Sequence, residues 1–302
     1  MGADASTRNL VDSVWEHQSV WSQTANVLKA RIDRLRTTML ALAVASAVLT
    51  TLATQTATLS TAGGRVLALA AGVTVGLVPV VRSRLGRDAV SRWTRARAVS
   101  EELKAECYRF LAGVTPYRGT DRQARLAERT RRVQDAAADL VVDTAGISAV
   151  KRDVPPVTDV ASYVDHRIVP QIGWYRSRST GLARRLARAR QLELGLAVVG
   201  VLLAATASTW RAGDVAAWVA VVTTLTAALS SHVAASRWEY QLVEYLRTAE
   251  ELNRLREEWV AQHATGLVID DDGAEDRLVE HCEHVVSIQN DGWMAKWTAD
   301  AR

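Results

Sequence analysis

The feature that most constrains this chain is a set of four apolar stretches without Asp, Glu, Lys or Arg, at residues 37–64, 66–81, 194–210 and 215–236. An α-helix rises about 1.5 Å per residue, so the longer stretches span a hydrocarbon core of about 30 Å. The second stretch reaches only about 24 Å and needs snorkelling arginines or the Gly63–Gly64 turn to cross. One soluble core has little room for four such helices, so the stretches favour membrane spans over buried core helices.

The apolar stretches form two pairs, and a short turn joins the members of each pair. The first turn is STAGGR at residues 60–65, and the second is RAGD at residues 211–214. Each pair predicts a transmembrane hairpin, with spans at about 38–60, 64–82, 192–210 and 214–236. We therefore expect an all-α membrane protein of four spans. Residues 1–36 are polar, which argues against a signal peptide.

Basic residues lie beside the spans on the side opposite these turns, which themselves contain only Arg65 and Arg211. The flanking residues are Lys29, Arg31, Arg34, Arg36, Arg82, Arg84, Arg87, Arg92, Arg95, Arg97, Arg176, Arg178, Arg184, Arg185, Arg188, Arg190, Arg237 and Arg247. This asymmetry predicts cytoplasmic N- and C-termini in a bacterial inner (cytoplasmic) membrane. Topology and anionic lipid headgroups explain the net charge of +4, so no nucleic-acid partner is expected.

One stretch is written twice, each time after a hairpin: SRWTRARAVSEEL at residues 91–103 and SRWEYQLVEYLRTAEEL at residues 236–252. An amphipathic helix precedes each hairpin, at residues 10–36 and 160–190. The sequence thus predicts two helix–hairpin–helix modules in the same orientation, unlike the inverted repeats of transporters.

The modules are expected at residues 1–150, including a linker helix at 121–142, and at 151–302, including a last helix at 277–297. The boundary is the run RDVPPVTD at residues 152–159. No proline or glycine interrupts the passage from residues 10–36 into the first span, so one long helix is expected there. The second span is likewise expected to continue into a helix at residues 91–111.

The aromatic and arginine pattern resembles the SLATT superfamily, the SMODS- and SLOG-associated two-transmembrane effector domains of bacteria. QIGWYRSRSTGLARRLARAR at residues 171–190 and WEHQSVWSQTANVLKARIDRLR at residues 15–36 look like the stretches before the first span in two SLATT subgroups. The resemblance implies an oligomeric, pore-forming membrane effector of bacterial defence, released by a nucleotide-sensing partner. The chain lacks a recognisable nucleotidyltransferase or SLOG domain, so that trigger would lie on another protein.

Polar residues recur at helical spacing inside two of the spans. The pore-lining candidates are Ser46, Thr50, Thr54, Gln55 and Thr58 in the first span, and Thr223, Thr226, Ser230 and His232 in the fourth. Hydroxyls can replace part of an ion's hydration shell along a wet path. They can equally join helices or bond back to their own helix, and both interpretations stay open. The absence of charge at mid-membrane argues against a small transporter.

Two further sets of residues are candidates for helix packing. Gly72 and Gly76 allow another helix to approach closely, and Pro79 introduces a kink or a gating hinge. Tryptophans on the extramembrane helices mark contacts between lead-in and lead-out helices or between subunits. They are Trp15, Trp21, Trp93, Trp174, Trp238 and Trp259.

No motif indicates catalysis. HCEH at residues 281–284 lacks a second cluster to complete a metal site, and DDDGAED at 270–276 lacks the EF-hand spacing. The chain has no G-x-S-x-G motif, P-loop or believable Ser/His/Asp set. Cys107 and Cys282 suggest no disulfide scaffold. We expect no enzyme, metal or cofactor, but a homo-oligomeric pore or membrane-disrupting assembly. The alternative is a non-catalytic membrane-anchored scaffold whose cytoplasmic helices recruit a partner.

Overall fold

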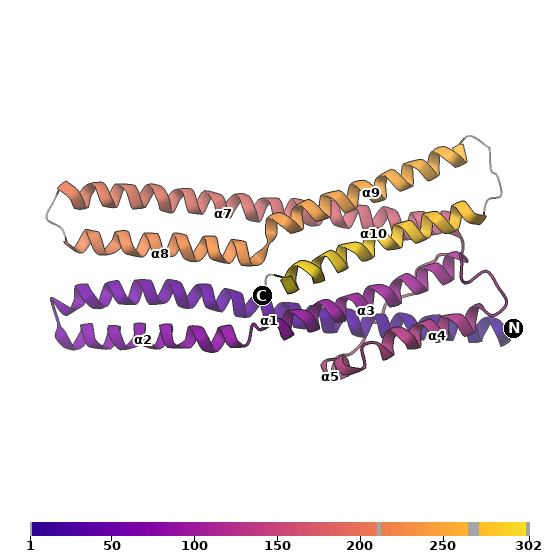
Figure 1. Ribbon diagram of the computed structural model, residues 1–302, viewed down its shortest axis with the longest axis horizontal. Helices are drawn as coiled ribbons and strands as arrows, with labels where there is room; N and C mark the ends of the chain where they lie inside the picture. The colour runs from indigo at the N-terminus through magenta and orange to yellow at the C-terminus, as the bar shows by residue number, and fades with distance from the viewer. Residues whose placement is uncertain (1, 210–212, 265–271, 300–302) are drawn as a thin grey trace. The chain divides into compact units, whose positions relative to one another are not determined.

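A computed structural model describes residues 2–209, 213–264 and 272–299, and within them every regular element is helical. The predicted all-α fold is therefore confirmed (Figure 1). The elements are α1 (Gly2–Ala57), α2 (Thr61–Ser83), α3 (Arg87–Ala112), α4 (Arg122–Asp135), η1 (Ala138–Leu140), α5 (Val141–Thr144), α6 (Val160–Tyr163), the π-helical turn η2 (Val164–Ile168), α7 (Val169–Thr209), α8 (Gly213–Ser236), α9 (Trp238–Ala264) and α10 (Asp272–Ala299).

The chain divides into two compact units. Unit 1 comprises Met1–Ala30, Arg87–Ser179 and Val243–Arg302, and unit 2 comprises Arg31–Gly86 and Thr180–Leu242. Each unit takes segments from both halves of the sequence. The long helices α1 and α7 therefore each contribute one part to unit 1 and the other part to unit 2.

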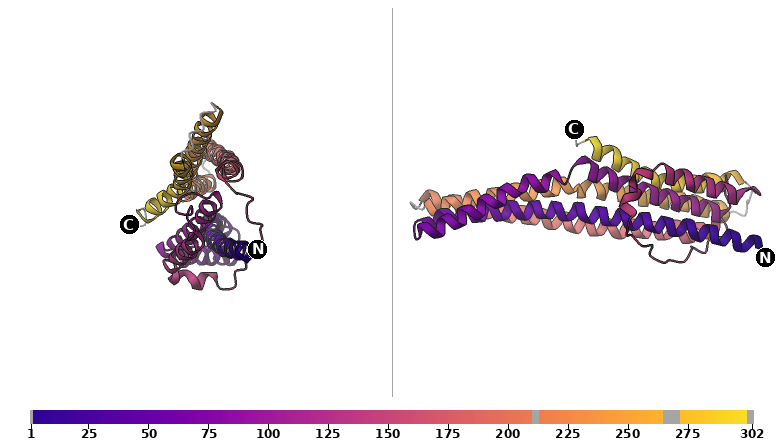
Figure 2. Two further views of the ribbon diagram at one scale, coloured as in Figure 1. Left: turned by 90° about the vertical axis from the view of Figure 1, so that its right-hand side faces the viewer. Right: turned by 90° about the horizontal axis from the view of Figure 1, so that it is seen from below.

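The long helix expected at the start of the chain is confirmed, since α1 runs unbroken from Gly2 to Ala57 (Figure 2). The expected continuation of the second span is wrong, because α2 ends at Ser83. The amide of Arg84 donates to the carbonyl of Val81 and that of Leu85 to the carbonyl of Arg82, and these three-residue steps close the helix. In the second hairpin, Arg237 separates α8 from α9 with a positive φ of 50°.

Small residues let the two helices of the first hairpin approach closely within unit 2. The hydroxyl of Ser60 caps α2 by accepting from the amide of Gly63 (3.2 Å). A Cβ built on the buried Gly64 would lie only 2.8 Å from the Cα of Ala57. In the second hairpin, a Cβ on Gly200 of α7 would lie 3.5 Å from the Val222 side chain of α8, an ordinary contact. The tight position is therefore in the α1–α2 turn.

Gly64→Ala tests this close approach. The added methyl group meets backbone atoms, so we expect overpacking to cost about 1–3 kcal/mol of hairpin stability. Gly72→Ala on the same helix is the control, because a Cβ there meets no atom within 4 Å. Proximity of cysteines introduced across the α1–α2 turn in detergent micelles, read as disulfide yield, should fall for Gly64→Ala only. Equal yields in the two variants would contradict the packing.

The core of unit 1 joins segments from both halves of the sequence. Along α3 lie α4 and α10. The principal apolar cluster combines α3 and the residues just after it, the segment before α6, α6 itself, η2, α7, α9 and α10. Its buried members are Tyr108, Ala112, Val114, Val157, Val160, Tyr163, Val164, Ile168, Ile172, Tyr175, Ala249, Leu252, Leu255, Leu278, Val279, Cys282 and Val286. Val157 comes from the run expected as a domain boundary, so that run enters the core.

The remaining sequence expectations for unit 1 are close to the structure. The linker helix expected at residues 121–142 is α4 followed by the short turns η1 and α5. The last helix begins at Asp272, earlier than the expected residue 277. Of the DDDGAED run, Asp270 and Asp271 lie outside the described residues, and the remaining residues belong to the start of α10.

Candidate functional site: buried ion pairs and membrane hydroxyls

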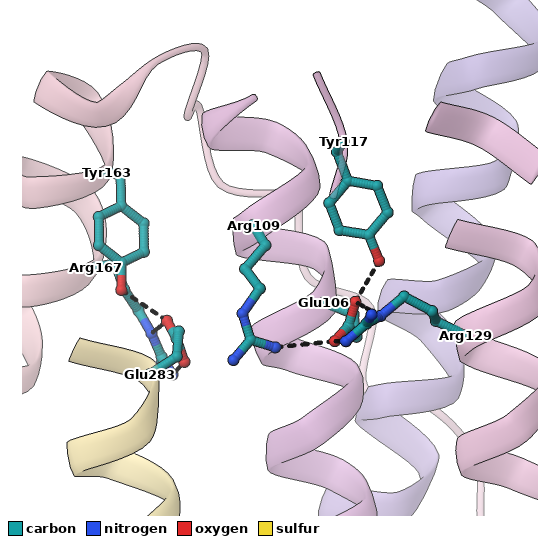
Figure 3. A network of polar contacts seen from close by, with 7 residues as sticks. All are labelled: Glu106, Arg109, Tyr117, Arg129, Tyr163, Arg167 and Glu283. Carbon is teal, nitrogen blue, oxygen red and sulfur yellow. Dashed lines mark hydrogen bonds and ion pairs between the residues drawn. The ribbon is translucent and has the colours of Figure 1, made fainter. Parts of the chain in front are cut away.

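Arg167 and Glu283 of unit 1 are deeply buried charged residues, and their side chains are 4% and 1% exposed. The Nε and Nη2 groups of Arg167 donate to the two carboxylate oxygens of Glu283, each at 2.9 Å (Figure 3). The Tyr163 hydroxyl donates to the same carboxylate at 2.8 Å. This bidentate ion pair holds η2 against α10, because separating the two elements would leave a buried charge without its partner.

The π-helical turn η2 carries Arg167 into the core between α6 and α7. The guanidinium lies 4.7 Å from the centre of the Tyr108 ring on α3. Tyr108 also meets Tyr163 and Trp15 edge to ring, at 5.9 and 6.0 Å. Side chains of α1, α3 and α6 thus surround an ion pair between η2 and α10.

Glu283 stays ionised in this environment. Burial alone would raise the pKa of Glu283, but the charge of Arg167 and the hydrogen bonds from Arg167 and Tyr163 outweigh it, so the pKa falls below its ordinary value. The stabilisation is therefore present at neutral pH and is lost only as the pH falls through this lowered pKa.

A second buried carboxylate, Glu106 of α3, collects four donors. Arg109 donates to it at 2.9 Å, and Arg129 of α4 donates through Nε (2.9 Å) and Nη2 (3.1 Å) (Figure 3). The hydroxyl of Tyr117 also donates to Glu106, and burial together with this carboxylate raises the pKa of Tyr117. Glu106 therefore joins α3, α4 and the segment between them.

A third carboxylate lies in the first copy of the repeated stretch. Glu101 is buried and pairs with Arg97 (3.0 Å) and Lys104 (3.8 Å). Burial would raise the pKa of Glu101, but Lys104, Arg97 and Arg167 lower it to about 2. All three carboxylates are paired with basic side chains inside the unit, where they fix the register of helices rather than face a substrate.

The pore-lining candidates of α1 lie largely on the chain's own surface within unit 2. Thr50, Thr54 and Thr58 are exposed, whereas Ser46 and Gln55 are partly buried. The hydroxyls donate within the helix: Thr50 to the Ser46 carbonyl (2.8 Å), Thr54 to that of Thr51 (2.8 Å) and Thr58 to that of Gln55 (2.6 Å). Each of these hydroxyls thus has a hydrogen-bond acceptor in its own segment, and the row of hydroxyls lies on the exposed side of the chain.

The candidates of α8 are arranged in two ways. Thr223 and Thr226 donate to carbonyls of their own helix, both at 2.9 Å. Ser230 instead donates to the carboxylate of Glu193 on α7 at 2.7 Å, and His232 meets Trp238 edge to ring at 5.9 Å. The structure brings Ser230 and His232 into contacts between elements, and leaves Thr223 exposed.

The packing candidates differ in their surroundings. Gly72 and Gly76 are exposed, and no atom lies within 4 Å of a Cβ built at either position. Pro79 lies inside α2, which continues past it to Ser83.

The tryptophans of the extramembrane segments contact several helices. Trp21 and Trp93 are buried, and Lys29 of α1 lies 4.7 Å from the Trp93 ring. Trp259 stacks on His263 at 3.9 Å. Trp174 is 37% exposed and meets Tyr245 of α9 at 5.6 Å. Among the tryptophan candidates described here, Trp174 thus has a side chain that is exposed on the surface of unit 1.

The HCEH run does not present its side chains together. His281 lies 3.6 Å from Glu251, whereas Cys282 and Glu283 point into the core. In the described ranges, no group of three His, Cys, Asp or Glu side chains is placed to hold a metal ion. Cys107 is buried too, and burial raises the pKa of its thiol to about 12.

The sequence pattern predicted neither the pairing of the buried charges nor a role for Glu193. Arg167 and Glu283 are 116 positions apart, so no local spacing joins them. Tyr163 and Arg167 do share the four-residue spacing of one helical face, which is a weak signal. Glu193 comes directly before an apolar stretch, and an acidic residue at that position is the sequence signal by which Glu193 could have been found.

These features define the class. Among the described residues, α1, α2, α7 and α8 contain segments long and apolar enough to cross a membrane, so this is an all-α, multi-pass membrane protein. Residues 163–293 match the family model of the SMODS and SLOG-associating 2TM effector domain 1, and residues 19–125 match a protein family of unknown function, DUF4231. The second half of the chain is thus similar to the SLATT effector domains, and the predicted resemblance is confirmed over that stretch. No curated protein and no solved structure matches the chain.

Proposed function

We propose that the protein is a non-catalytic bacterial membrane effector whose copies assemble into a pore or a membrane-disrupting oligomer. Its partners are the lipid bilayer, further copies of itself and a cytoplasmic nucleotide-sensing protein that releases it. The proposed location is the inner membrane with both termini cytoplasmic, in line with the positions of the flanking arginines. The matches at residues 19–125 and 163–293 fall one in each half and support tandem modules at 1–150 and 151–302.

One observation carries the pore proposal. Thr50 and Thr54 of α1, and Thr58 in the turn directly after it, are exposed at four-residue spacing in an apolar stretch without charged residues. Lipid tails offer these hydroxyls no polar partner. In a ring of copies that turn this face inward, the same hydroxyls line a path for ions. The hydroxyls of Thr50 and Thr54 donate to carbonyls of the preceding turn, so lone pairs of their oxygens can still accept from water or bind an ion.

Thr50→Leu/Thr54→Leu tests the path. In cells that express the protein together with its natural neighbour proteins, membrane potential is followed with a potential-sensitive dye. We expect depolarisation to slow by about tenfold or more, because an apolar constriction excludes water from a narrow pore. Membrane insertion should be unchanged, since both substitutions increase the apolar character of the span.

The control is Thr206→Leu/Thr224→Leu, which removes two exposed hydroxyls from α7 and α8 outside the predicted rows. This variant should depolarise the membrane like the unmodified protein. Depolarisation that survives Thr50→Leu/Thr54→Leu would show that the α1 row lines no pore. A membrane potential that stays intact at high expression of the unmodified protein would rule out the pore itself.

In that event the scaffold function gains support from a different observation. Val243 and Leu246 of α9 and Trp174 of α7 are exposed on unit 1, at 42%, 49% and 37%. An apolar patch on an extramembrane unit suits recruitment of a partner protein. The scaffold predicts that Trp174→Ala abolishes partner recovery without any change in membrane potential.

A further inference from the structure

The part of α7 that precedes its apolar stretch is unusually rich in arginine. Six arginines lie between Arg176 and Arg190, and that interval contains no Asp or Glu. The helix is continuous from Val169 to Thr209, so these arginines have a fixed distance from the apolar segment that follows. The first acidic residue of α7 is Glu193, whose carboxylate accepts a hydrogen bond from the Ser230 hydroxyl.

Three of these arginines form an exposed set within unit 2: Arg184, Arg185 and Arg188. Leu182, Leu186 and Ala189 are buried and define the opposite side of the helix. Among the described residues, none of the three arginines forms an ion pair. Their neighbours on the same helix are engaged: Arg190 pairs with Glu239 at 3.2 Å, and Arg178 lies 5.4 Å from the Trp174 ring.

The helical rise places this set at the membrane surface. Arg188 precedes Leu194, the first residue of the apolar stretch, by about 9 Å, and Arg184 precedes it by about 15 Å. The headgroup layer on one side of a bilayer is about 5–8 Å thick. Arg188 therefore reaches the headgroups, and Arg184 and Arg185 lie within about one Debye length of them.

Other exposed arginines of unit 2 flank the first hairpin in the same way. Arg31 and Arg34 precede the first apolar stretch, and Arg82 and Arg84 follow the second. In α7 the density is higher and carboxylates are missing, so the unbalanced positive charge is greatest there.

We propose that Arg184, Arg185 and Arg188 form a binding site for the phosphate groups of anionic phospholipid headgroups, such as phosphatidylglycerol. A guanidinium donates two parallel hydrogen bonds to a phosphate, and no protein carboxylate competes at these three positions. The site selects the lipid next to α7 and anchors this helix at a fixed depth. It does not depend on whether the assembled protein conducts ions.

The test uses the full chain in phosphatidylcholine nanodiscs that contain a trace of spin-labelled phosphatidylglycerol or spin-labelled phosphatidylcholine. Electron paramagnetic resonance gives the fraction of each labelled lipid that the protein immobilises. One arginine at the surface contributes about 1 kcal/mol, and Arg188 is the one of the three that reaches the headgroups, so we expect at least about fivefold preference for phosphatidylglycerol at this site. The preference should fall with salt, and it should disappear in Arg184→Gln/Arg185→Gln/Arg188→Gln.

Two further variants distinguish binding at this site from an effect of total charge and from a change in membrane topology. Arg125→Gln/Arg131→Gln/Arg132→Gln removes the same charge from exposed positions of α4 in unit 1 and should keep the preference. Arg184→Lys/Arg185→Lys/Arg188→Lys keeps the positive charge that sets membrane orientation. This variant should retain most of the preference for phosphatidylglycerol. Protease accessibility confirms that each variant inserts in the same orientation.

Three results would overturn the proposal. One is full preference in the correctly inserted Gln variant of α7, and another is an equal loss in the α4 variant. The third is loss of preference when inorganic phosphate replaces chloride at equal ionic strength, since the site would then take free phosphate. None of these readouts measures conductance, so they are distinct from a failure of the pore.

Discussion

Glu283→Gln is expected to destabilise unit 1 by about 3–5 kcal/mol, because it leaves the Arg167 guanidinium buried without a counter-charge. Glutamine keeps the size of the side chain and can still accept from Tyr163, so loss of charge dominates the effect. At about 1.4 kcal/mol per tenfold change, opening of the unit should become about a hundredfold to a few thousandfold more frequent.

The two native cysteines provide the measurement. Cys107 and Cys282 are 0% and 1% exposed, and both lie in unit 1. Maleimide labelling of the full chain in detergent micelles therefore requires the unit to open. Labelling of Cys107 is the cleaner readout, since Cys282 is next to the substituted residue.

Two variants make this experiment specific to the buried pair. Glu280→Gln removes an exposed charge one turn away on α10 and should leave the labelling rate within about threefold of the unmodified protein, as most surface substitutions do. Arg167→Met/Glu283→Gln removes both charges and should recover part of the loss. If Glu283→Gln labels no faster than Glu280→Gln, the ion pair contributes no stability to the unit.

Leu252→Ala and Leu103→Ala are each expected to cost about 2–5 kcal/mol, the usual range for a leucine removed from a packed core. These leucines end the two copies of the repeated stretch, and they are 1% and 0% exposed. Both leucines therefore lie inside the chain's own core and are not exposed on its surface.

The loss of helix signal on heating, followed by circular dichroism in micelles, should show a lower midpoint for both variants. Leu246→Ala is the matched control in α9, since Leu246 is 49% exposed, and it should change stability by no more than about 0.5 kcal/mol. A Leu252→Ala variant as stable as Leu246→Ala would mean that the repeated leucine is not a core residue.

Much of the helical plan could be predicted because it depends on local chemistry. The four apolar stretches, the turn at Ser60 and the long α1 follow from hydropathy, capping and the absence of breakers over short intervals. The break after Ser83 also has a local signal that the sequence prediction missed. Arg82 lies in the last turn of α2 and Gly86 follows closely, which is a pattern typical of a helix end.

The sequence by itself determined where the chain enters an apolar environment, since a segment's length and lack of charge are properties of consecutive residues. Only the tertiary structure decided how the polar residues are used. Arg167 meets Glu283 across 116 positions, and Glu106 meets Arg129 across 23. Such pairs form because burial makes a lone charge costly and folding brings its partner near, and neither factor can be read from linear spacing.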